Sequence, residues 1–419
     1  MDRHAWKHVG WILLIALAVR LAGVALWHYR TEGRFFFGDS ETYWQLGRAI
    51  AHGDEYVYPA EGFDARVFRT PGYPLLLAPL FLASDEPPVL WARIQVAVVG
   101  SLAAGAVWCL ARQLFCSRAA LVAGLIAAVY PGAVATSSMV LTETPFSALM
   151  LLQFCMWVAA WHSTGRSRAV KLGLGSGAAA GAAVLVRPSW LLFTPAVIGI
   201  MWAGTWLRNR PAFRGWALAV LAAMLAVLVP WWVRNGRVTG HFVPTTLQVG
   251  ASLYDGLNPH ATGASDMAFV ERFVAEQQRR DVDAEVPLEV RLDRRMRREA
   301  LAWARRHPAC AARLALVKFA RMWNLWPNEP ELSGWGIRLA MAGTYVPVMV
   351  LAMFGAWRTF HLGWPYVLCW LPAVYFTALH IVFVSSIRYR EPAMLPLMVL
   401  AAGAVFSRAT TPQPQQEVR

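Results

Sequence analysis

Long apolar stretches recur along this chain, and no other feature of the sequence limits its fold as strongly. A helix that crosses a bilayer needs about 20 mostly apolar residues, because lipid offers no hydrogen-bond partner to an exposed backbone group. We expect spanning helices near Val9–Trp27, Val89–Phe115, Ala119–Met139, Pro145–Trp161, Val170–Val186, Trp190–Trp206, Trp216–Val233, Trp335–Trp357, Trp364–Val384 and Pro392–Phe406. Tyr73–Ala83 is shorter and is predicted to be a half-helix or re-entrant piece. The predicted fold is an all-α polytopic membrane bundle with about ten spanning helices.

Composition supports a membrane protein, and with no RNA-binding or DNA-binding motif in the sequence we expect no nucleic-acid partner. Apolar residues make up 57% of the 419 positions and charged residues only 15%, whereas a soluble domain carries about 25% charged residues. The formal net charge is +14. The arginines lie mainly between the apolar stretches, where they set membrane topology or meet anionic lipid and phosphate. Membrane lipids are therefore expected partners.

The short loops predict the orientation of the chain. Basic residues crowd alternate loops and are predicted to be cytoplasmic: Arg3 and Lys7; Arg112 and Arg118; Arg166, Arg168 and Lys171; Arg208, Arg210 and Arg214. Both termini are then cytoplasmic, and the long polar segments 30–88 and 234–334 are extracytoplasmic. Arg234 and Arg237 oppose this assignment, but long loops obey the charge rule poorly. Residues 1–408 form one predicted domain in the plasma (inner) membrane, and 409–419 a disordered cytoplasmic tail.

The second polar segment is predicted to be largely helical. Ala268–Trp303 is rich in Glu and Arg and has few helix breakers apart from Pro287. Ala309–Trp326 places basic residues among apolar ones, a pattern typical of a helix that lies in the membrane interface. The five cysteines show neither metal-ligand spacing nor a disulfide framework.

The stretch Phe35–Trp44 holds the first candidate for chemistry. Asp39 follows three phenylalanines just outside the first apolar stretch. Partial desolvation there favours the protonated carboxyl and raises its basicity, as a general base requires. The alternative interpretation is that Asp39 caps a helix over Ser40–His52.

Further charged residues stand at the predicted outer ends of helices. Arg69, in the turn Phe68–Pro74, is a candidate to bind a phosphate through its N–H donors. The alternative is an arginine at the membrane interface that keeps its charge in water. Glu143 begins a spanning helix, where it is a functional candidate or simply complements the helix dipole. Arg187 ends another helix. Ser385–Pro392 either binds a phosphate or diphosphate through its arginines or is an ordinary charged loop. Arg20 lies inside the first helix, and we expect it to have a structural partner within the bundle.

The ordered set of these features resembles the GT-C glycosyltransferases, close to the protein mannosyltransferases (glycosyltransferase family 39-like) and the lipid A aminoarabinose and galacturonic acid transferases. The matching pieces span nearly the whole chain: Arg20-Leu21, Gly38-Asp39 with Tyr43, Arg69–Pro74, Glu143, Arg187-Pro188, Pro230–Asn235, Gly256–Pro259, and Arg388–Arg390 with Pro392. Protein mannosyltransferases carry an adjacent Asp-Glu pair where this chain has Asp39-Ser40-Glu41, which puts a protein acceptor in doubt.

The resemblance implies a sugar donor linked to polyprenyl phosphate and used on the extracytoplasmic face. It implies Asp39 as catalytic base, with transfer that inverts the anomeric centre. The remaining expected substrate-binding residues are Tyr43, Arg69, Tyr73, Glu143, Arg187, Asn258, Arg388, Tyr389 and Arg390. The acceptor would be a glycan, a lipid or a protein. No metal-ligand cluster demands a cofactor, although Asp39 and Glu143 would hold a divalent metal ion if they converge.

Two other functions remain open at this stage. A secondary transporter or lipid flippase would also have many helices and intramembrane arginines, but it usually shows internal repeats, and none is found. An O-antigen ligase or polymerase would share the lipid-linked donor, with essential residues such as His241 or His260 in the second polar segment. No phosphate-binding loop or dinucleotide fingerprint suggests a nucleotide donor.

Overall fold

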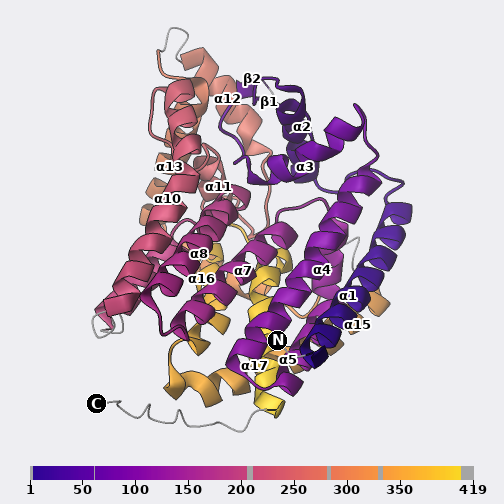
Figure 1. The fold of residues 1–419 in the computed structure, drawn as a ribbon. Helices are drawn as coiled ribbons and strands as arrows, with labels where there is room; N and C mark the ends of the chain where they lie inside the picture. Colours follow the sequence, from indigo (N-terminus) through magenta and orange to yellow (C-terminus); the bar gives the residue numbers. More distant parts are fainter. Residues whose placement is uncertain (1–2, 61, 205–210, 281–284, 329–333, 407–419) are drawn as a thin grey trace.

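The computed structural model describes residues 3–60, 62–204, 211–280, 285–328 and 334–406 (Figure 1). The longer helices are α1 (Arg3–Arg30), α4 (Val89–Leu114), α7 (Glu143–Trp161), α8 (Arg166–Val186), α10 (Pro211–Thr239), α13 (Leu288–Arg306) and α15 (Trp335–Thr359). The shorter α-helices are α2 (Gly38–His52), α3 (Gly72–Ala83), α5 (Ser117–Val129), α6 (Pro131–Ser138), α9 (Phe193–Ala203), α11 (Val249–Gly256), α12 (Phe269–Arg280), α14 (Pro308–Met322), α16 (Leu371–His380) and α17 (Glu391–Phe406). Single turns of 3₁₀-helix are η1 (Pro188–Trp190), η3 (Phe360–Leu362), η4 (Tyr366–Cys369) and η5 (Ile387–Arg390). Arg208, Arg210 and the predicted tail 409–419 lie outside the described residues.

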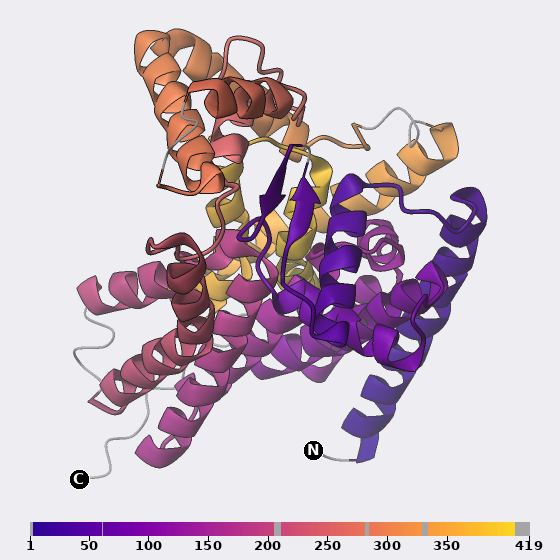
Figure 2. The ribbon, with the colours of Figure 1, turned by 90° about the horizontal axis from the view of Figure 1, so that it is seen from above.

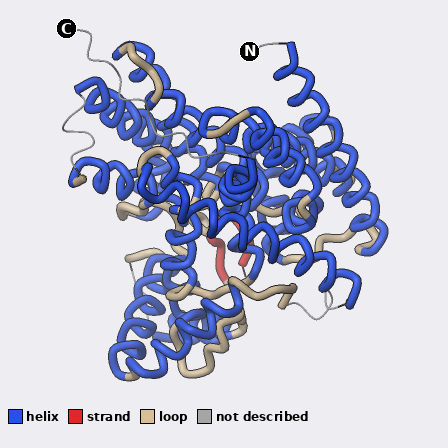
Figure 3. Tube along the Cα trace, turned by 90° about the horizontal axis from the view of Figure 1, so that it is seen from below, coloured by secondary structure: helices blue, strands red, loops and turns tan. Residues whose placement is uncertain are grey.

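The described chain is almost entirely helical, which confirms the predicted fold class (Figure 3). In the part that the structure describes, the strands are β1 (Tyr58–Ala60) and β2 (Phe63–Ala65), which pair antiparallel with Tyr58 opposite Ala65. Seen from above, this hairpin and the helices of the second polar segment cover one end of the bundle (Figure 2). We call this end, formed by the described residues of the segments 30–88 and 234–334, the polar end. Helix α1 begins and α17 ends at the opposite end (Figure 1).

The spanning helices are fewer, by length and composition, than the ten stretches named above. Six described helices are long and apolar enough to cross a membrane, and the bent pair of α5 and α6 would make a seventh. The other expected spans form helices of 11 residues in α9, 10 in α16 and 16 in α17. Turns of 3₁₀-helix take up part of the stretches that hold α9 and α16, whereas α17 is continuous over the whole expected stretch and is simply short. The expected short helix at Tyr73–Ala83 is α3, of 12 residues.

Close packing of α8 against α10 depends on three glycines spaced four residues apart. A Cβ atom on Gly173, Gly177 or Gly181 would lie 2.9, 2.2 or 3.0 Å from a backbone oxygen of α10. Small residues at this spacing let helix backbones approach in membranes, where van der Waals contact replaces the hydrophobic effect. The packing fixes the end of α8, where Arg187 stands.

The expected partner of Arg20 is found at the bend between α5 and α6. Arg20 is 1% exposed, and its guanidinium donates to the carbonyls of Ala127 and Ala128 at 3.1 and 2.8 Å and to Ser137 Oγ at 3.2 Å. Ala127 would accept from the backbone N–H of residue 131 in a continuous helix, but Pro131 has none. The two helices meet at 48°. Arg20 therefore satisfies carbonyls that the bend leaves free, as a structural residue.

The second polar segment has a small core of its own. The buried side chains of Leu253, Tyr254, Phe273, Leu292 and Met296 pack α11, α12 and α13 together. The predicted helix over 268–303 is confirmed as two helices, α12 and α13. The predicted interfacial helix is α14, which exposes Leu316 at 71% and Phe319 at 49%.

Candidate functional site

A cavity of about 460 Å³ opens at the polar end, where both polar segments meet the ends of the bundle helices. Its charged lining comes from five separate parts of the chain: Asp39 in α2, Arg69 in the turn before α3, Glu143 at the start of α7, Arg187 at the end of α8, and Arg388 in η5. Three guanidinium groups face two carboxylates, which leaves one positive charge in excess. We call this space the Asp39 cavity.

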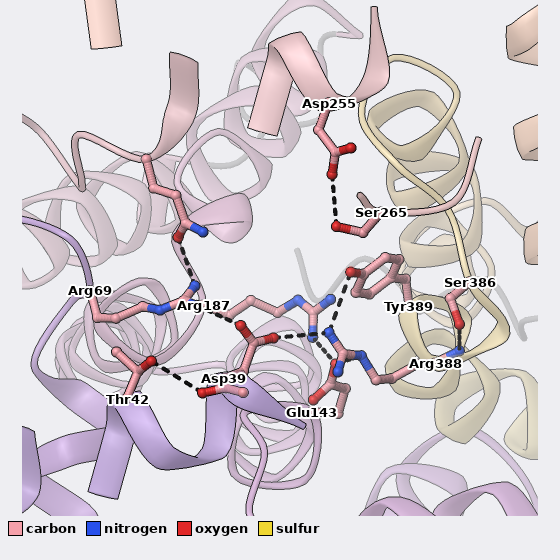
Figure 4. Close-up of polar contacts among 12 residues, drawn as sticks. Asp39, Thr42, Arg69, Glu143, Arg187, Asp255, Ser265, Ser386, Arg388 and Tyr389 are labelled. Atoms are coloured by element: carbon pink, nitrogen blue, oxygen red, sulfur yellow. Dashed lines mark hydrogen bonds and ion pairs between the residues drawn. The ribbon is translucent and has the colours of Figure 1, made fainter. Parts of the chain in front are cut away.

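Asp39 lies between two arginines (Figure 4). Its Oδ1 accepts a hydrogen bond from Arg69 Nη2 at 2.5 Å, and its Oδ2 accepts one from Arg388 Nη2 at 3.3 Å. Arg69 also donates from Nη1 to Gln248 at 2.6 Å. The alternative role as a helix cap is not observed, because Phe37 is the residue before α2 and no side chain caps that end.

The sequence predicted a raised pKa for Asp39, and this prediction is wrong. Burial alone would raise the pKa of Asp39, but the charges and hydrogen bonds of Arg69 and Arg388 lower the pKa below its ordinary value. Opposite charges within a few ångströms favour the charged form of a carboxyl group. The sequence shows the neighbouring aromatic residues but does not show that two distant arginines converge on this group.

Glu143 is the second carboxylate of the cavity and is 2% exposed. Its Oε1 lies 3.1 Å from Arg187 Nη1 and 3.0 Å from Arg388 Nε, and its Oε2 has no hydrogen-bond partner among the described residues. Arg388 thus contacts both carboxylates at once (Figure 4). A buried charge needs such pairing, so Glu143 holds Arg187 and Arg388 in place.

The backbone before Arg69 is fixed by the second polar segment. Glu289 in α13 accepts hydrogen bonds from the backbone N–H groups of Arg66 and Val67 at 3.0 and 3.1 Å. Arg234, at the end of α10, donates to the carbonyl oxygens of Arg66 and Tyr56. These contacts hold the two polar segments together and place Arg69 at the cavity.

Aromatic rings support the charged residues. The ring of Tyr43 lies 5.2 Å from the Arg69 guanidinium and meets Tyr73 edge-on at 5.1 Å. Tyr73 is fully buried behind Tyr43 and does not line the cavity. The ring of Tyr389 lies 5.3 Å from Arg187 and stacks on His380 at 4.3 Å.

Besides Tyr73, two predicted site residues do not line the Asp39 cavity. Asn258 donates to the carbonyl of Tyr254 at 2.8 Å and lines a separate cavity of about 380 Å³. Arg390 is fully buried, donates to the carbonyls of Met322 and Asn324, and lies 3.9 Å from the ring of Tyr345. The contacts of Asn258 and Arg390 are therefore structural. Of the two arginines in η5, Arg388 lines the Asp39 cavity and Arg390 does not.

Other lining residues were not predicted. Gln248 and Thr246 come from the connection between α10 and α11, and no sequence signal marks them. His380 lies within an apolar stretch, where an ionisable residue is a functional candidate by default, so that signal was available. The histidines that would suit a ligase, His241 and His260, do not line this cavity.

The carboxylates of the Asp39 cavity are not arranged as ligands of a divalent metal ion. Asp39 and Glu143 approach each other only through Arg388, and each oxygen in contact faces a guanidinium. Within the described ranges, no three His, Cys, Asp or Glu side chains gather as a metal site would require.

Comparisons with known proteins agree on the kind of fold. Residues 71–233 match the family model described as dolichyl-phosphate-mannose-protein mannosyltransferase. That segment includes Glu143 and Arg187 but not Asp39, Arg69 or Arg388. No curated protein matches the chain.

Solved structures match over nearly the whole chain. The oligosaccharyltransferase of Archaeoglobus fulgidus in the apo form has a TM-score of 0.57 at 14% identity, with 95% of this chain and 50% of that chain covered. AglB, the same organism's oligosaccharyltransferase in complex with an inhibitory peptide and a dolichol-phosphate, gives 0.59 at 14%, with 97% and 51% covered. ArnT from Cupriavidus metallidurans bound to undecaprenyl phosphate gives 0.46 at 16%, with 95% and 78% covered.

The chain therefore resembles the GT-C membrane glycosyltransferases and has the fold of the archaeal oligosaccharyltransferase. It spans about half the length of the archaeal structures that it matches.

Proposed function

We propose that this protein transfers a sugar from a polyprenyl-phosphate donor to an acceptor hydroxyl, on the extracytoplasmic face of the plasma (inner) membrane. The observation that carries the proposal is the placement of Asp39 between Arg69 and Arg388 in a cavity with an excess of positive charge. A carboxylate beside phosphate-binding groups is the arrangement that such a transfer needs.

The arginines of the cavity suit the phosphate of the donor. A guanidinium binds phosphate oxygens through forked N–H donors, and it stays charged when buried. Arg69 and Arg388 already lie in the same cavity and would stabilise the charge that develops on the departing phosphate. Apolar side chains of Leu191, Leu192 and Phe383 line the same space and suit the first isoprene units of the lipid. AglB in complex with a dolichol-phosphate is a precedent for such a ligand on this fold.

The transfer itself would be a single displacement. The acceptor oxygen forms a bond to the anomeric carbon and gives its proton to the Asp39 carboxylate. The bond between the anomeric carbon and the phosphate oxygen breaks, and the phosphate keeps the electron pair. Attack from the face opposite the phosphate inverts the anomeric centre, so one carboxylate suffices as base.

The lowered pKa of Asp39 is compatible with this role. Its cause is ion pairing with Arg69 and Arg388. A donor phosphate that draws these guanidinium groups to itself weakens their effect on Asp39, and the pKa of the carboxyl then rises toward its ordinary value. Binding of the donor would therefore make Asp39 a stronger base.

The test is a transfer assay in lipid nanodiscs, with radiolabelled polyprenyl-phosphate sugars and an envelope extract as acceptor. Wild type is compared with Asp39→Asn and with Glu41→Gln, which changes an exposed carboxylate two residues further along α2. Donor consumption by wild type and Glu41→Gln but not by folded Asp39→Asn supports the proposal. A wild-type protein that consumes no donor but moves another solute across the membrane is a transporter, and the proposal fails.

A further inference from the structure

A second cavity, of about 440 Å³, lies on the other side of Arg388. Its walls are α1, the bend of α5 and α6, and α15, and most of its lining is apolar: Gly23, Leu26, Trp27, Val134, Ala340 and Met341. Leu26 is 61% exposed on a predicted spanning helix, so the cavity borders the lipid-facing surface. We call it the α1–α15 groove.

The groove and the Asp39 cavity share one wall. Arg388 lines both spaces, and the ring of Phe37, which lines the groove, lies 5.0 Å from the Arg388 guanidinium. A molecule in the groove would therefore reach the residue that pairs with Asp39 and Glu143. The two spaces are placed to bring two substrates to one point from different sides.

Glu391 places a carboxylate in the lining of the groove, which also includes the guanidinium groups of Arg30 and Arg388. It is 5% exposed, and neither carboxylate oxygen has a hydrogen-bond partner among the described residues. Its nearest cation is Arg390, whose Nε lies 3.9 Å from Oε1. The carboxylate packs against Gly132 so closely that a Cβ there would be 2.2 Å from Oε2. A buried carboxylate without hydrogen bonds is costly, so its partner is expected from a bound molecule.

We propose that the α1–α15 groove binds a lipid whose head carries a hydroxyl or amine that donates to Glu391, and that this lipid is the acceptor of the sugar. The assignment as acceptor rests on the function proposed above; the lipid site does not. The apolar wall suits a hydrocarbon chain, whereas a peptide there would leave backbone groups unsatisfied.

The carboxylate of Glu391 distinguishes this lipid from the sugar donor. A phosphate placed beside Glu391 would meet a second negative charge, and like charges repel in a low dielectric. A hydroxyl or amine therefore fits the position beside Glu391, and the donor phosphate fits the guanidinium groups of the Asp39 cavity.

The test is photo-cross-linking in nanodiscs with a diacylglycerol that carries a diazirine on one acyl chain. Peptide mapping should place the label on α1, α6 or α15. Ala340→Trp, and independently Ala135→Trp, fill the groove from two helices at exposed positions and should lower this labelling by about tenfold. Leu339→Trp is the matched control, because Leu339 is 68% exposed on α15 and does not line the groove.

The outcomes separate this inference from the proposed function. Equal labelling of Ala340→Trp and Leu339→Trp overturns the lipid site. Displacement of the diacylglycerol by polyprenyl phosphate but not by phosphatidylethanolamine overturns it too, because the groove then holds the donor. Specific labelling in a protein that turns over no donor keeps the lipid site and removes the transferase.

Discussion

The Nη2 atom of Arg388 lies 3.3 Å from Oδ2 of Asp39, although 349 positions separate the two residues in the sequence. The contact joins the first polar segment to the turn before the last helix. An ion pair that closes such a long loop must be held by its surroundings, since loop closure costs conformational entropy. Glu143 provides that support, because its Oε1 lies 3.0 Å from Arg388 Nε.

Asp39→Asn tests the base directly. Removal of a general base typically costs about 10²–10⁴ in rate, so we expect transfer to fall by that factor while donor binding is retained or strengthened, because Arg69 and Arg388 lose a competing carboxylate. Single-turnover transfer and donor binding are measured separately. Loss of donor binding together with transfer would instead make Asp39 a structural partner of the arginines.

The two arginines of η5 should respond differently to the same change. Arg388→Gln removes a guanidinium from the cavity, and we expect donor affinity to fall by about tenfold to a hundredfold, as loss of a charge-assisted contact implies. Arg390→Gln removes donors to the carbonyls of Met322 and Asn324, so it should lower the thermal unfolding midpoint. Donor titration and thermal unfolding of both variants decide the matter. An Arg390→Gln protein that is fully stable but has weakened donor affinity contradicts the assignment.

Much of this architecture could be predicted from the sequence because it follows from local patterns. Apolar stretches predicted the bundle, and the amphipathic pattern predicted α14. The buried Arg20 was expected to have a structural partner because a charge inside a spanning helix needs one. Which partner it has depends on Pro131 breaking a helix more than a hundred positions away.

The site was less predictable because its geometry is made by long-range contacts. Asp39, Arg69, Glu143, Arg187 and Arg388 were each identified, but their ion pairs were not. For that reason, the direction predicted for the pKa shift of Asp39 was wrong. Asn258 and Arg390 lie in motifs that match the family, but their side chains donate to backbone carbonyls. The spacing of residues in the sequence does not show where a side chain points. Gln248 and Glu391 gain their importance only from the cavities that they line.

Glu289 gives a prediction for pH. Burial raises the pKa of Glu289 to about 7, although backbone N–H groups of Arg66 and Val67 act to lower it. The native state then holds the proton more tightly than the unfolded state, so Glu289 makes the protein less stable as pH rises from about 4.5 to about 7, by at most about 3 kcal/mol. We expect Glu289→Gln to reduce the fall in thermal unfolding midpoint between about pH 5 and about pH 8. An unchanged fall would show that Glu289 is ionised throughout.

The bend between α5 and α6 gives a test that involves no chemistry at the site. Arg20→Met removes the donors that satisfy the carbonyls of Ala127 and Ala128. Pro131→Ala restores a backbone N–H that can pair with Ala127 in a straighter helix. The effect of Pro131→Ala on the free energy of unfolding should therefore be more stabilising in the Arg20→Met background than in wild type. The expected difference is about 1 kcal/mol, the energy of one hydrogen bond. Unfolding midpoints of the two single variants and the double variant measure this coupling. Additive effects would mean that Arg20 does not serve the carbonyls freed by Pro131.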